Sequence, residues 1–175
     1  IEELTAFLQD ASHASSEAIR SGLLALIEAG HQSKDLATLD SAILKLSEID
    51  PSDLQIPRGK LFRAMLMKNA GKIDEARQEI ESLLADFSEF DEKSAALFEL
   101  ADLEYSAGAW DACRSRASAF VERFPNHELA PAAWRYLAIS SSRSANDTPQ
   151  TKERFVQDLE ALLKHKELFS SEEAK

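Results

Sequence analysis

The 175-residue sequence contains few of the residues that disulfides, strands and phosphate-binding loops require. A single cysteine excludes an internal disulfide. Valine occurs only twice and threonine four times, and because β-branched residues favour strands, their scarcity predicts an all-α protein. Only five glycines are present, and they form no glycine-rich phosphate loop. We therefore expect packed helices, rather than disulfides or strands, to hold the fold together.

Excess positive charge and long apolar runs are also missing. The formal net charge is −11, which disfavours nucleic acid and anionic membrane surfaces because both attract cationic patches. No apolar run reaches the roughly 18–20 residues that a membrane-spanning helix needs. Hydrophobic residues make up 44% of the chain, which is enough for a packed core. We therefore expect an acidic helical protein that neither binds nucleic acid nor inserts directly into a membrane.

Residues that build catalytic and metal sites are scattered along the chain. The chain has four histidines: His13, His31, His127 and His165. None of them lies at a spacing that builds a metal or nucleophile site. Cys113 falls on an inward helix face and is expected to be a small core residue. The acidic cluster at 89–92 lacks the alternating ligands and central glycine of a calcium loop, and is expected to open a helix. The sequence thus predicts a protein without catalytic residues, metal or cofactor, which is not an enzyme.

A repeat of 37 residues dominates what the sequence does contain. Gly71 and Gly108 lie 37 residues apart, and similar segments follow them at 73–76 and 110–113. Glycine permits the left-handed turn at a helix C-terminus, so each glycine marks the turn of a helical hairpin. A fixed period of this size is typical of a stacked solenoid, in which each hairpin buries its apolar face against its neighbours.

Helices are expected, from the apolar spacing, at about 1–11, 16–30, 34–49, 58–70, 73–87, 92–107, 110–124, 131–144 and 150–168. We expect one domain over residues 1–168, a frayed tail at 169–175, and repeats that cover about 16–56, 57–93, 94–130 and 131–168. The helix at 1–11 is expected to be a partial or capping helix of a trimmed chain. Lys60 and Arg63 occupy positions that are apolar in other repeats, so we expect buried stems and solvated charges.

The repeats resemble the tetratricopeptide repeat, a helix–turn–helix motif of about 34 residues. The best copy matches the family pattern at Leu97, Leu100, Ala101, Gly108, Trp110, Cys113, Ala117, Phe120 and Pro125. It departs from the pattern at Cys113, where alanine is usual, and at Ala117, where an aromatic residue is common. The resemblance covers residues 16–168 and implies a right-handed α–α superhelix of antiparallel hairpins. Slightly long repeats of this kind are similar to those of bacterial cell-envelope proteins, which favours a periplasmic or envelope location, with a cytoplasmic location as the alternative.

Partners of this family usually bind on the concave side, which the first helix of each hairpin lines. The inner positions expected to form the binding groove are Leu61, Met65, Phe98, Asp102, Tyr105 and Arg135. The alternative is that Leu24, Leu61 and Phe98 simply pack against the second helices. Family members that clamp a C-terminal carboxylate carry lysine where this chain has those three residues, so we expect no such binding.

Two functions fit this pattern. The first is a non-catalytic scaffold or adaptor that binds a protein, as an extended peptide or an amphipathic helix, in the concave groove. The second is a structural segment of a longer solenoid, which stacks on further repeats or associates with itself as a homo-oligomer. The identity of the partner does not follow from the sequence.

Overall fold

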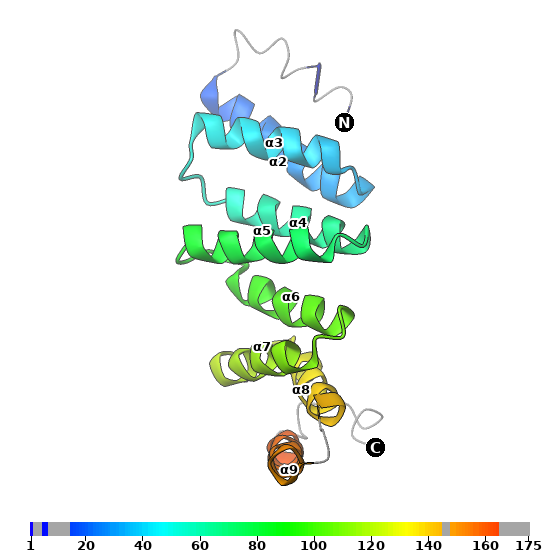
Figure 1. Ribbon diagram of the computed structural model, residues 1–175. Coiled ribbons are helices and arrows are strands. Elements are labelled where there is room, and N and C mark those ends of the chain that lie inside the picture. The colour runs from blue at the N-terminus through cyan, green and yellow to red at the C-terminus, as the bar shows by residue number, and fades with distance from the viewer. Residues whose placement is uncertain (2–4, 7–14, 145–147, 165–175) are drawn as a thin grey trace. The chain divides into compact units, whose positions relative to one another are not determined.

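The structure, a computed structural model, describes residues 1, 5–6, 15–144 and 148–164. Its helices (Figure 1) are α2 (Ser16–Ser33), α3 (Leu36–Ile49), α4 (Ile56–Asn69), α5 (Ile73–Asp86), α6 (Lys93–Ser106), α7 (Trp110–Arg123), α8 (Ala130–Ser144) and α9 (Pro149–Lys164). No strand occurs in this part of the chain, so the prediction of an all-α protein is confirmed. The observed bounds lie within about three residues of the expected ones, except for the expected end of the last helix at 168, which lies outside the described residues. The predicted helix at 1–11, the residues after 164 and two histidines, His13 and His165, lie largely or wholly outside the described residues.

The helices group into two compact units, an N-terminal unit over residues 1–92 and a C-terminal unit over 93–175. In the N-terminal unit α2 packs on α3, α3 on α4, and α4 on α5. In the C-terminal unit α6 packs on α7, α7 on α8, and α8 on α9, while α6 also contacts α8. The division at Glu92 and Lys93 falls at the expected end of the second repeat, so each unit contains two helical hairpins.

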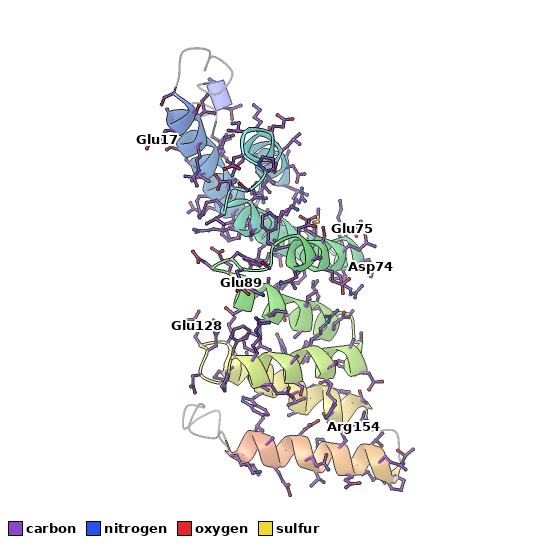
Figure 2. The ribbon with its side chains drawn as sticks, turned by 90° about the vertical axis from the view of Figure 1, so that its left-hand side faces the viewer. Glu17, Asp74, Glu75, Glu89, Glu128 and Arg154 are labelled. Atoms are coloured by element: carbon purple, nitrogen blue, oxygen red, sulfur yellow. The ribbon has the colours of Figure 1, made fainter. Side chains whose placement is uncertain are left out.

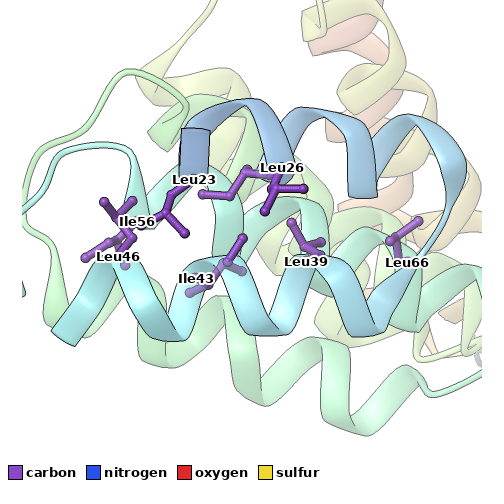
Figure 3. Close-up of a cluster of buried hydrophobic side chains, with 9 residues drawn as sticks. Leu23, Leu26, Leu39, Ile43, Leu46, Ile56 and Leu66 are labelled. Atoms are coloured by element: carbon purple, nitrogen blue, oxygen red, sulfur yellow. The ribbon is translucent and has the colours of Figure 1, made fainter. Parts of the chain in front are cut away.

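Leucine and isoleucine side chains from three helices form the core of the N-terminal unit. The labelled members in Figure 3 are Leu23, Leu26, Leu39, Ile43, Leu46, Ile56 and Leu66. They recur three or four residues apart on α2 and α3, which places them on one face of each helix. Leu39 and Leu46 are completely buried. This face-to-face packing, rather than intrinsic helix propensity, supplies most of the stability of such short helices.

In each of the first three hairpins, the turn between the two helices contains a residue in the left-handed conformation. Gly71 and Gly108 have φ angles of 78° and 68° and follow α4 and α6. Lys34 stands one repeat period before Gly71 and has a φ of 58°, although lysine costs about 1 kcal/mol more than glycine there. The next residue, Asp35, caps α3 by accepting hydrogen bonds from the backbone N–H groups of Ala37 and Thr38 at 3.1 and 3.2 Å. The left-handed backbone conformation therefore recurs every 37 residues, even where the residue is lysine instead of glycine.

The two charged residues at apolar repeat positions on α4 form ion pairs with the neighbouring helices. Arg63 pairs with Asp40 of α3 at 3.3 Å and with Glu79 of α5. Lys60 pairs with Asp86 at 3.4 Å, and its ammonium lies 5.6 Å from the centre of the Phe87 ring. Both residues are partly buried, and the Nε of Arg63 is itself buried, so the charge of Arg63 is less solvated than expected.

Small residues and two large aromatic side chains fill the core of the C-terminal unit. Ala101, Ala117 and Ala133 are completely buried beside Phe120 and Trp134, so that α6, α7 and α8 approach closely. Cys113 is also completely buried, and burial raises the pKa of its thiol to about 11. The thiol therefore stays protonated at neutral pH, and the prediction of a core cysteine is confirmed.

The surface is predominantly acidic. The labelled side chains Glu17, Asp74, Glu75, Glu89 and Glu128 in Figure 2 are all exposed. Asp74 and Glu75 lie in the first turn of α5, where a negative charge interacts favourably with the positive end of the helix dipole. No helix in the described ranges combines the length and the hydropathy needed to cross a membrane.

Candidate partner-binding surface

Three aromatic rings of α6 and α8 stack on one another in the C-terminal unit. The ring of Tyr136 on α8 lies 5.5 Å from that of Phe98 and 4.6 Å from that of Tyr105, nearly parallel to both. Phe98, Asp102 and Tyr105 are spaced four and three residues apart, so they share one face of α6. Tyr136 donates a hydrogen bond from its hydroxyl to the carboxylate of Asp102. We call these four partly exposed residues the aromatic surface.

The hydrogen bond within the aromatic surface has a fixed direction. The pKa of the Tyr136 hydroxyl lies far above its usual value. Burial raises it most, and the hydrogen bond to Asp102 and the negative charge of Asp102 raise it further. The phenol therefore remains a protonated donor throughout the physiological range. The hydrogen bond thus ties the ring of Tyr136 on α8 to α6.

Trp110 and Arg143 continue this cluster toward the start of α7 and the end of α8. The Trp110 ring meets the Tyr105 ring edge-on, with centroids 5.7 Å apart. The guanidinium of Arg143 lies 6.0 Å from the centre of the Trp110 ring. Phe120 supports the surface from below, since its ring contacts Phe98 edge-on at 5.6 Å. The surface is thus anchored in the buried core of the C-terminal unit.

A smaller stack occupies the matching positions in the N-terminal unit. The rings of His31 on α2 and Phe62 on α4 stack at 3.8 Å and 10°. These residues lie two repeat periods before Tyr105 and Tyr136. Arg58 covers the outer side of Phe62 at 5.3 Å and pairs with Glu28 at 2.7 Å. Glu28 in turn lies two periods before Asp102, so the two stacked rings and the acid recur with changed chemistry.

Three of the six predicted groove residues, Phe98, Asp102 and Tyr105, meet in the aromatic surface. Arg135 is exposed on α8, directly before Tyr136. Leu61 and Met65 lie on α4 in the N-terminal unit, where Met65 is partly exposed but Leu61 is only 3% exposed. Leu61 therefore has almost no surface to offer a partner, in agreement with the alternative that it packs in the interior.

Sequence reasoning missed two ring-bearing residues, Phe62 and Tyr136. The expected register selected the residue before each of them, Leu61 and Arg135. A signal was present in the sequence, because His31 and Phe62 recur two periods later as Tyr105 and Tyr136. A search for aromatic residues at twice the repeat length finds these pairs.

Within the described ranges, no group of three or more histidine, cysteine or acidic side chains is arranged to hold a metal ion. His127, one of the two described histidines, is held by Ser94 at 3.0 Å and packs edge-on against Phe120. Comparison with known protein families and with curated proteins finds no match for this chain.

Proposed function

We propose that the protein is a non-catalytic scaffold that binds a segment of another protein on the aromatic surface. The observation that carries this proposal is the stack of Phe98, Tyr105 and Tyr136, which stays partly exposed although it rests on the core. Tyrosine and tryptophan are enriched at binding interfaces because they supply a large contact area with few rotatable bonds. The backbone period of Lys34, Gly71 and Gly108 supports the further proposal that the hairpins form a tetratricopeptide-like superhelix.

The partner that best fits is an amphipathic helix or extended peptide with apolar side chains and at least one basic residue. Ring faces attract cations as well as apolar groups, and Asp102 places a carboxylate among them. The net charge of −11 also steers a basic segment toward the protein. The apolar side chains supply the affinity and the basic residue the orientation.

Selection of peptides from a random displayed library on the immobilised full chain tests this proposal. We expect selected peptides to combine aromatic or aliphatic residues with lysine or arginine. The variant Tyr105→Ala should bind such a peptide at least about tenfold more weakly, since it removes a central ring of the surface. Tyr105→Phe, which keeps the ring, should bind it almost normally.

The matched control is Ser115→Ala on the second helix of the same hairpin, where the side chain is exposed. This control should bind the selected peptide like the unmodified chain, and circular dichroism should show unchanged helix content in all variants. If Tyr105→Ala binds as well as Ser115→Ala, the aromatic surface is not the binding site.

Self-association as part of a longer solenoid is a second candidate function, favoured by the outer face of α9. Val156 and Leu163 on this face are 51% and 62% exposed, and apolar residues in such positions are suited to packing against another helix. Sedimentation velocity over a range of concentrations tests this function. Association that is abolished by Val156→Glu and Leu163→Glu together would support it, and a monomer at every concentration would exclude it.

A further inference from the structure

Helix α9 differs from the other described helices in what it buries. Each of the others buries at least three residues, most of them apolar, whereas within α9 the one buried residue is the carboxylate Asp158. Asp158 stands one repeat period after Val121, which is a buried apolar residue of α7. An acid therefore stands where the two preceding repeats have an apolar residue. A buried carboxylate needs compensation by hydrogen bonds and an opposite charge, so its surroundings decide whether α9 stays in place.

Arg114 of α7 and Ser141 of α8 form a seat for this carboxylate. Arg114 donates from Nε to Oδ2 of Asp158 at 2.7 Å and from Nη2 to Oδ1 at 2.9 Å. Ser141 donates its hydroxyl to the same carboxylate and accepts from Arg114 Nε at 3.0 Å. A two-pronged contact of this kind matches the planar shape of a carboxylate and no other common side chain. The seat is the carboxylate-binding site formed by Arg114 of α7 and Ser141 of α8, and the carboxylate that it binds belongs to α9.

Apolar contact around the seat is incomplete. On one side Ala161 and Leu162 of α9 pack against the hydrophobic cluster of the C-terminal unit, both still partly exposed. On the other side a solvent-open cleft of about 490 Å³ lies between part of α8 and part of α9. Phe155 and Leu159 line the cleft from α9, and Ile139 lines it from α8. Helix α9 therefore buries no apolar side chain fully, and the ion pair of its carboxylate is its one fully buried contact in the described part of the chain.

We propose that the face of α7 and α8 beneath α9 is a docking site for a helix that carries a carboxylate flanked by apolar residues, with α9 as its displaceable occupant. The partner in trans is an amphipathic helix with an acid in the position of Asp158. Larger side chains in the positions of Phe155 and Leu159 fill the cleft that α9 leaves open. This site is separate from the aromatic surface and takes a partner of opposite charge preference, so it goes beyond the function proposed above.

Competition between the two helices follows the usual rules for an intramolecular ligand. A tethered α9 acts at an effective concentration in the millimolar range, which suppresses binding of a free helix of equal quality. Weakening the tethered helix, or improving the free one, removes this advantage. The site is therefore largely closed in the unmodified chain and opens when α9 loses its carboxylate.

A fluorescent peptide of residues 149–164 with capped ends is the probe, titrated by anisotropy against the full-length chain. The variant Asp158→Ala should bind this peptide at least about tenfold more tightly than the unmodified chain, because its own α9 no longer fills the seat. The same peptide with Asp158→Asn should bind the variant chain at least about tenfold more weakly, because a neutral amide replaces the carboxylate. Adding Arg114→Gln to the variant chain should abolish the difference between the two peptides.

Two results would overturn the proposal. The first is that the Asp158→Ala chain, with α7 and α8 still protected from hydrogen exchange, binds both peptides equally or binds neither. The second needs no variant: in the unmodified chain, α9 amides would exchange hydrogen as slowly as those of α7 and α8. The proposal requires α9 to exchange at least about tenfold faster, since only the occupant opens.

Discussion

Two stacks at equivalent repeat positions show how one backbone pattern takes on different chemistry. His31 and Phe62 in the N-terminal unit, and Tyr105 and Tyr136 in the C-terminal unit, stack with centroids 3.8 and 4.6 Å apart. In the first stack the neighbouring Glu28 pairs with Arg58. In the second the equivalent acid accepts a hydrogen bond from Tyr136. The two ring pairs thus lie at equivalent positions of the repeat. The surfaces differ because Glu28 pairs with a charged arginine and Asp102 with a tyrosine hydroxyl.

Two arginine–aspartate pairs extend the comparison. Arg20 of α2 donates from Nη2 to Oδ1 of Asp53 at 3.1 Å, and Arg114 binds Asp158 through two nitrogens. Both aspartates are buried. Helix α2 is also held by buried Leu23 and Leu26, whereas α9 has no buried apolar residue. The ion pair is therefore one of several buried contacts of α2, whereas it is the one fully buried contact of α9 in the described part of the chain.

Removing large side chains from equivalent core positions should have the largest effect. Leu46 and Phe120 lie two repeat periods apart, and both are almost completely buried. We expect Leu46→Ala to cost about 2–5 kcal/mol and Phe120→Ala about 3–5 kcal/mol in free energy of unfolding. Urea denaturation followed by circular dichroism measures both. Leu44→Ala, at a position 61% exposed, is the control and should change stability by less than about 0.5 kcal/mol. A Phe120→Ala variant as stable as this control would contradict the core assignment.

Removing each arginine should separate the two ion pairs. Arg114→Met leaves Asp158 buried without its cation, and hydrogen exchange in α9 should become at least about tenfold faster. Arg20→Met should leave exchange in the middle of α2 nearly unchanged, because Leu23 and Leu26 keep the helix docked. Mass spectrometry of exchanged peptides measures both. Equal effects on α2 and α9 would show that the two pairs play the same role.

Acid should weaken the Asp53 pair. The hydrogen bond from Arg20 holds the pKa of Asp53 below its usual value, more strongly than burial raises it. Because the folded-state pKa lies below the unfolded value of about 3.9, this carboxylate stabilises the fold above about pH 4 and loses that contribution as the pH falls through its folded pKa. Asp53→Asn should therefore lose less stability than the unmodified chain on acidification from pH 5 to 3. Parallel losses in urea titrations at these pH values would contradict this assignment.

The smallest effects are expected at the hairpin turns. Gly71→Ala and Gly108→Ala should each cost about 1 kcal/mol, because both positions have positive φ and an added Cβ meets no close neighbour. Lys34→Gly should stabilise the N-terminal unit by up to about 1 kcal/mol for the same reason. Thermal melting measures all three. Lys34→Ala is the control and should give no gain.

The helices themselves could be predicted from the sequence, because apolar spacing and turn residues act locally. Gly71 and Gly108 mark their turns, whereas Lys34 did not reveal its left-handed turn because lysine is unusual there. The core role of Cys113 followed from its place on an inward face. These features need only the residues of one hairpin.

The composition of the aromatic surface could be predicted only in part, because it depends on how neighbouring helices interdigitate. Tyr136 fits between Phe98 and Tyr105 of α6, one residue beyond the position that exact repetition predicts. Side chains of packed helices insert between those of their neighbours rather than opposite them, so equivalence in sequence does not ensure contact. The seat of Asp158 was missed for a related reason: Arg114 lies 44 residues away and outside any repeat register.

Cys113 gives the protein a built-in reporter. It is the one sulfhydryl in the sequence, it lies wholly inside the C-terminal unit, and its protonated form resists alkylation. The rate at which a thiol reagent modifies the chain therefore measures how often that unit opens, without any engineered label. The N-terminal unit contains no cysteine, so the reagent does not react with it. A single reagent therefore measures the opening rate of the C-terminal unit alone.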